Sequence, residues 1–118
     1  TNFIEGKVLN KNVIEIDNKQ LDFIGHGYTK GTKVLVAARP ECIQLSKKTG
    51  KNIFNGTVVD VEFLGSFLRI YLETSFMPNQ RLIIDKPMIG VFDKSTAIGD
   101  VLGFTMSPTY LNVYECEE

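Results

Sequence analysis

The chain has 118 residues, and its 13 Lys and Arg residues nearly balance its 14 Asp and Glu residues, so the formal net charge is −1. This balance disfavours a nucleic-acid-binding protein, because neutralising backbone phosphates normally requires a cationic chain. The 43% hydrophobic content fits one compact domain, and no apolar run approaches the length of a membrane-spanning helix, so no direct membrane insertion is expected.

The first fifty residues form a series of short apolar segments joined by polar turns. Alternating apolar residues predict strands over 1–9, 13–16, 21–24, 34–38 and 43–45. Clusters of Asn and Asp between the first three segments are typical of hairpin turns. His26 lies between two glycines, where a turn residue is a simpler interpretation than a catalytic or switch role.

The second part of the chain continues the same pattern. The polar segment 47–52 is the expected boundary between two halves. Strands are predicted over 56–64, 67–73, 81–85 and 110–114, with an apolar stretch from Gly99 towards Pro108 before the last of them. Segment 86–98 receives no assignment. Because no helical period occurs, nine or ten short strands indicate an all-β fold, either a barrel or paired small barrels.

One glycine-to-proline phrase occurs twice. Gly31 precedes Pro40 by nine residues, and Gly99 precedes Pro108 by the same nine, with two alternating apolar residues after each proline. Proline lacks an amide hydrogen, so each strand should break at a corner there, and the preceding residue should be extended. We interpret the chain as two diverged halves, residues 1–50 and 51–118, with these four residues as structural corners.

Motifs of catalysis are missing from the sequence. It has no phosphate-binding loop, no nucleophile elbow and no HExxH helix. Glu62 with Glu73, or Asp60 with Glu62, could be taken as a carboxylate pair, but acids alternating along a strand usually mark its solvent-facing side. We therefore predict no catalytic residue, no resident cofactor and no metal site in this chain.

The lysines and the cysteines of the chain do not indicate a binding or metal site. The densest basic cluster, Lys47, Lys48 and Lys51, falls in a polar loop and is interpreted as solvated. The two cysteines, Cys42 and Cys116, lie 74 residues apart and have no Cys/His metal spacing. So few thiols favour a reducing compartment, although the sequence leaves open whether the two meet.

Arg39 and Glu41 flank the first proline, and the repeat offers an internal control for them. The second proline has Ser107 and Thr109 at the same places, so the corner itself does not require charges. The default interpretation is a solvated ion pair of little energetic value. The alternative is a charged contact to another domain or a second subunit, and we treat Arg39 and Glu41 as its candidates.

Four stretches resemble the TOBE (transport-associated OB) domain found at the C-terminus of ATP-binding subunits of bacterial ABC importers. They are Asn2–Val8, Arg39–Leu45, Gly56–Gly65, and Gly99–Leu102 followed by Pro108 and Val113-Tyr114. The match in order and spacing spans nearly the whole chain. The resemblance implies an OB-like β architecture built from two similar halves, and it implies that the chain is a fragment of a longer ATPase.

The resemblance also implies a function. The chain would be the regulatory and dimerisation domain of a nutrient-import ATPase for iron, polyamines or a related small solute, and would not itself hydrolyse ATP. ATP and magnesium would belong to the parent, which would form a homodimer and bind membrane permease subunits. The expected location is cytoplasmic, peripheral to the inner face of the cell membrane. A molybdate-binding version of the domain has an opening phrase with Ser and Arg-Asn that is not found here.

Two other functions remain open. One is a sensor that holds an oxyanion or metal at a dimer interface, which ligand-dependent thermal stabilisation would reveal. The other is a single-stranded nucleic-acid binder, since OB folds often bind nucleic acid through cationic grooves with exposed aromatic residues. The charge balance disfavours the second, as does our expectation that most of the aromatic residues lie on buried strand faces.

Overall fold

The protein consists of β-strands and short 3₁₀ turns in a computed structural model that describes residues 1–25, 27–87 and 96–116. His26 and most of the unassigned segment 86–98 therefore fall outside the described residues. No helix within the described ranges is long and apolar enough to cross a membrane.

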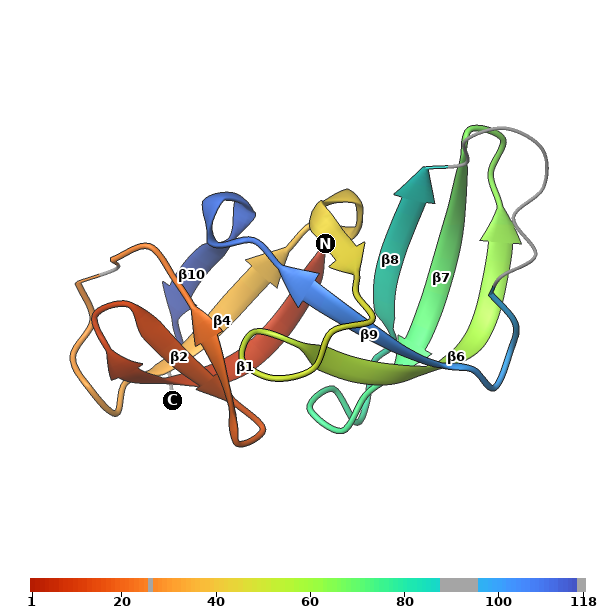
Figure 1. The fold of residues 1–118 in the computed structure, drawn as a ribbon. Helices are drawn as coiled ribbons and strands as arrows, with labels where there is room; N and C mark the ends of the chain where they lie inside the picture. Colours follow the sequence, from red (N-terminus) through yellow and green to blue (C-terminus); the bar gives the residue numbers. More distant parts are fainter. Residues whose placement is uncertain (26, 88–95, 117–118) are drawn as a thin grey trace.

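In the described ranges, ten strands form two five-stranded sheets that lie side by side (Figure 1), and the molecule measures 47 × 26 × 25 Å. Sheet A has the order β10-β4-β1-β2-β3 and sheet B the order β5-β9-β6-β7-β8. The strands are β1 (Asn2–Asn10), β2 (Val13–Ile16), β3 (Lys19–Asp22), β4 (Lys33–Ala38), β5 (Ile43–Leu45), β6 (Phe54–Phe63), β7 (Phe67–Glu73), β8 (Leu82–Pro87), β9 (Val101–Met106) and β10 (Asn112–Glu115). All paired neighbours are antiparallel, and the prediction of an all-β fold is confirmed.

The sheets exchange one strand between the two halves of the sequence. β5 comes from the first half, yet it pairs with β9 of sheet B, with Ile43 opposite Met106. β10 comes from the second half, yet it pairs with β4 of sheet A, with Asn112 opposite Ala37. The division into 1–50 and 51–118 thus stays a prediction about the sequence repeat, because each sheet contains a strand from the other half.

The repeated glycines occupy matching positions in the two sheets. Gly31 and Gly99 have φ values of +90° and +95°, which only glycine adopts without strain. Each donates its amide hydrogen at 2.8 Å to a strand that opens its half, to the carbonyl oxygen of Val8 and of Val58 respectively. The two halves therefore start β4 and β9 in the same way.

The repeated prolines begin the two 3₁₀ turns, η1 (Pro40–Cys42) and η2 (Pro108–Tyr110). Arg39 before the first is extended, with φ −74° and ψ 142°, and Ser107 before the second has φ −69° and ψ 132°. Each turn sends the chain across to the other sheet, so the proline phrase is the place where the strand exchange happens.

The core is one apolar cluster shared by both sheets. Alternation along β7 buries Leu68, Ile70 and Leu72, as the sequence predicts. Phe54 and Phe104 stack with ring centroids 6.1 Å apart at the centre of sheet B. The expectation that most aromatic residues lie on buried strand faces was wrong, because among the described aromatic residues only these two are fully buried. Four are largely exposed, namely Phe3, Phe63, Tyr110 and Tyr114.

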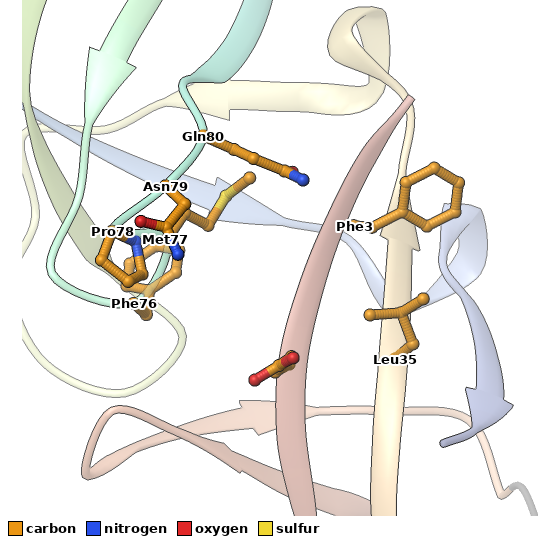
Figure 2. A pocket seen from close by; sticks show the side chains of 8 residues that line it. Phe3, Leu35, Phe76, Met77, Pro78, Asn79 and Gln80 are labelled. Atoms are coloured by element: carbon orange, nitrogen blue, oxygen red, sulfur yellow. The ribbon is translucent and has the colours of Figure 1, made fainter. Parts of the chain in front are cut away.

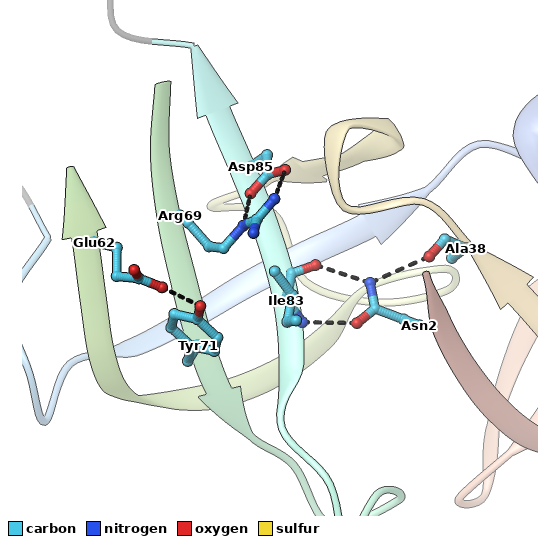
Figure 3. A network of polar contacts seen from close by, with 7 residues as sticks. All are labelled: Asn2, Ala38, Glu62, Arg69, Tyr71, Ile83 and Asp85. Atoms are coloured by element: carbon cyan, nitrogen blue, oxygen red, sulfur yellow. Dashed lines mark hydrogen bonds and ion pairs between the residues drawn. The ribbon is translucent and has the colours of Figure 1, made fainter. Parts of the chain in front are cut away.

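Asn2 joins the two sheets through a buried side chain (Figure 3). Its Nδ2 donates to the carbonyl oxygen of Ile83 at 2.8 Å and to that of Ala38 at 3.2 Å. Its Oδ1 accepts from the amide of Ile83 at 2.7 Å. β8 is an edge strand of sheet B, so this one amide satisfies both backbone groups that Ile83 turns away from β7.

Asn52 makes a related contact with the edge strand of sheet A. It precedes β6 as Asn2 opens β1, and its Oδ1 accepts from the amide of Asp22 on edge strand β3 at 2.7 Å. The Asp22 carboxylate accepts hydrogen bonds from Lys51, at 2.8 Å, and from Asn52, at 3.0 Å, and these bonds lower its pKa. Each half of the chain thus begins by closing the edge strand of the other sheet.

We predict that Asn2→Ala destabilises the fold by about 1–3 kcal/mol, because the part-buried amide and carbonyl of Ile83 lose their partner. Urea unfolding followed by circular dichroism measures the change. Asn79→Ala is the matched control, since Asn79 is exposed in a loop and should change stability by less than about 0.5 kcal/mol. Equal effects of the two substitutions would contradict the role assigned to Asn2.

Candidate functional site

A pocket of about 620 Å³ lies beside the connection between β5 and β6, on sheet B. Asn55 and Gly103 stand opposite each other in the β6–β9 pairing and help to line it. Their neighbours Phe54 and Phe104 are fully buried, so Asn55 and Gly103 belong to the face turned away from the core. The pocket is therefore built on the outer face of the sheet.

A close backbone approach shapes this pocket. Ser46 donates its amide hydrogen to the carbonyl oxygen of Gly103 at 2.8 Å, which extends the β5–β9 pairing by one residue. A Cβ atom on residue 103 would lie 2.5 Å from the carbonyl oxygen of Ser46. Glycine is the residue that lets the chain from Ser46 onward cross so closely over β9.

Positive charge dominates the lining. Lys47 and Lys48 are exposed in the connection, and Lys86 reaches the pocket from β8. Ser46 and two threonines add hydroxyl groups, and the Ser46 hydroxyl accepts from the amide of Lys48 at 3.2 Å. None of the described residues that line this pocket is acidic. We call it the lysine pocket.

The lysine cluster noted in the sequence is divided by the fold. Lys51 turns to sheet A, where it pairs with Asp22, whereas Lys47 and Lys48 line the pocket. All three are exposed, as their interpretation as solvated expects, but the sequence analysis did not predict that two of them line a pocket. The sequence contains no pattern that places a loop lysine over a glycine some fifty residues later, because that contact comes from the pairing of β5 with β9.

Arg39 and Glu41 are both exposed at η1, which packs beside β8. Within the described residues neither forms an ion pair, so the two do not pair with each other. Pro40 and Pro108 lie at the 3₁₀ turns and Gly31 and Gly99 at the strand starts, as described above. The fold thus places the two charges at a corner, and their proposed contact with another subunit stays a prediction.

The cysteines and acids show no site in the described part of the chain. Cys42 follows the end of β4 at Ala38, whereas Cys116 donates its amide hydrogen to Lys33 at the other end of that strand. Both cysteines are free. No group of three potential metal ligands occurs among the described residues.

Two acids on the outer face of sheet B, Glu62 and Asp85, form side-chain hydrogen bonds (Figure 3). Arg69 binds Asp85 through two hydrogen bonds of 2.9 and 3.0 Å, which raise the pKa of the guanidinium. Tyr71 donates to Glu62, and this bond raises the pKa of the phenol. Asp60, Glu62 and Glu73 are all exposed, so the interpretation of these acids as marking the solvent-facing side is confirmed.

Comparison with known proteins identifies the family. The TOBE domain family matches residues 36–109, more than half of the chain. The chain belongs to the TOBE domain family. Among solved structures, the cytoplasmic molybdate-binding protein ModG, in a crystal form with molybdate bound, has a TM-score of 0.76. The alignment covers 95% of this chain and 94% of that chain at 13% identity, so it shows the shared OB-like fold. No curated protein matches the sequence.

We predict that Gly103→Ala destabilises this TOBE domain by about 1–3 kcal/mol, because the new methyl group would push Ser46 away from β9. Gly25→Ala is the control, since its Cβ would meet its nearest atom at 3.7 Å, an ordinary contact. Thermal unfolding of the two variants measures the difference. A Gly103→Ala protein that melts with the parent would mean that the crossing is not tight.

Proposed function

We propose that this TOBE domain is a non-catalytic regulatory module that binds a small oxyanion in the lysine pocket. The observation that carries the proposal is the lining itself, which includes three lysines, Ser46 and two threonines and no described acidic residue. Hydrogen bonds from ammonium groups to anionic oxygens are shorter and stronger than neutral ones. A tetrahedral dianion would accept such bonds from Lys47 and Lys48 and from the hydroxyl groups beside them.

The similarity to ModG adds support for the ligand class. ModG is described as molybdate-binding, and its fold covers nearly all of this chain. At 13% identity the ligand does not transfer with the fold, and the opening phrase of the molybdate-binding version is not found here. The proposal therefore names the class of oxyanions, with molybdate, sulfate and phosphate as the probes.

We predict that Lys47→Gln with Lys48→Gln weakens oxyanion binding about tenfold or more, because two charge-assisted hydrogen bonds are lost. Isothermal titration calorimetry with molybdate at low salt measures the affinity, since screening weakens such contacts. A matched control is Lys11→Gln with Lys30→Gln, which changes the net charge equally at two exposed turns away from the pocket.

Equal weakening in the two double variants would show that only the net charge matters, and it would overturn the site. The absence of binding by all three oxyanions to the parent domain would overturn the proposed ligand class.

A second function rests on the importer resemblance. We propose that the domain regulates the ATP-binding subunit of an ABC-type importer, with ATP and magnesium held elsewhere in the parent and permease subunits as partners. Such a complex would lie in the cytoplasm, at the inner face of the membrane. The observation that favours it is the exposed pair Arg39 and Glu41, which the corner at Pro40 does not need. An ion sensed by the domain would be the signal passed on.

We predict that Arg39→Ala weakens self-association, or docking on the parent ATPase, without unfolding the domain. Sedimentation velocity measures association, and the melting temperature reports the fold. Lys30→Ala, in an exposed turn, is the control for the loss of one positive charge. If the Arg39→Ala protein associates as the parent does, the contact assigned to this corner is wrong.

A further inference from the structure

The two halves of the chain differ in the connection between β7 and β8. The equivalent connection in sheet A, between β2 and β3, consists only of residues 17–18, whereas the one in sheet B runs over residues 74–81. This longer loop lies beside β1, and a pocket of about 390 Å³ forms between them (Figure 2). Because the short turn leaves no such wall, the other half cannot form the same pocket.

Apolar and aromatic groups supply one part of the lining. Phe3 extends from β1 and is 47% exposed, and Leu35 lies next to it on β4. Phe76, Met77 and Pro78 line the pocket from the loop, which Figure 2 shows on the other side of β1 from Phe3 and Leu35. Phe76 is held in place by an edge contact with Phe54, their ring centroids 5.6 Å apart. Phe76 is therefore anchored, whereas Phe3 is exposed at the pocket.

The rest of the pocket lining consists of side chains that carry hydrogen-bond-accepting oxygens. Glu5 contributes a carboxylate, and Asn79 and Gln80 contribute side-chain amides with carbonyl oxygens. None of the described residues that line the pocket is basic. Leu35 stands opposite Glu5 in the β1–β4 pairing, and Glu5 forms no ion pair or hydrogen bond within the described part of the chain.

The repeat shows that these residues are not required by the fold. At the matching places relative to Gly56, the second half has Ile53 where the first has Phe3, and Asn55 where the first has Glu5. The aromatic ring and the carboxylate therefore occur together on the one face that the long loop adjoins. Because the matching strand forms without an aromatic ring or a carboxylate, this combination indicates a binding site and not a need of the strand itself.

We propose that this pocket binds an aliphatic ammonium ion. The charged nitrogen would lie beside the Glu5 carboxylate, and its carbon groups would pack on Phe3 and Phe76, whose ring faces attract cations. The amide oxygens of Asn79 and Gln80 would accept hydrogen bonds from a primary ammonium group. The site is separate from the lysine pocket, because the two share no lining residue, and it goes beyond the oxyanion function.

Titrations of the 118-residue chain with three small molecules test the proposal. Choline and butylammonium are the quaternary and primary probes, and dimethylbutanol is the neutral carbon isostere of choline. In ¹H–¹⁵N spectra both cations should shift the resonances of residues 3–5, 76–77 and 79–80 at millimolar concentration, and dimethylbutanol should not. Binding by choline alone, or by butylammonium alone, would narrow the ligand to quaternary or primary ammonium ions and would still support the site.

Two variants locate the binding energy. Glu5→Gln should weaken the cation about fivefold, and Phe3→Leu should weaken choline by a similar factor, because one removes the charge and the other the ring. Glu115→Gln is the control, since this exposed acid on β10 does not line the pocket. Absence of binding by both cations, equal binding of the neutral isostere, or equal effects of Glu5→Gln and Glu115→Gln would overturn the proposal.

Discussion

The fold depends on how each half of the chain closes the sheet of the other half. An edge strand leaves backbone amides and carbonyls without partners, and two small sheets lying side by side would have several such edges. The Asn2 side chain satisfies both groups of Ile83 on β8, and Asn52 binds the amide of Asp22 on β3. Together with the exchanged strands β5 and β10, these contacts hold the two sheets against each other.

Comparison of the two similar halves of the chain distinguishes residues that the fold requires from residues that are free to serve a function. Features that recur in both halves, such as the glycines before β4 and β9 and the prolines at the 3₁₀ turns, serve the backbone. The outer faces differ. Sheet B combines Gly103 with the lysines that follow β5, whereas sheet A combines Phe3 and Glu5 with a neighbouring loop. One scaffold thus presents two pockets of opposite charge.

Local patterns predicted most of the strands but little of the sites. The alternation along β7 and the glycine and proline phrases are signals of a few residues, so the sequence alone placed these elements well. Strand exchange pairs residues far apart, and nothing near Ile43 indicates that its partner is Met106. The lysine pocket was missed for that reason. Most aromatic residues were expected on buried strand faces, because alternation reveals that a strand has two faces, but not which face contacts the core.

The central claim is that the lysine pocket, and not the surface at large, recognises an oxyanion. The most direct measurement is a molybdate titration of the isotope-labelled domain, followed by ¹H–¹⁵N chemical shifts assigned along the chain. Our account predicts saturable shifts confined to the Ser46–Thr49 connection and to residues near Gly103, with sheet A unchanged. Shifts that never saturate, or that spread over lysines throughout both sheets, would contradict it.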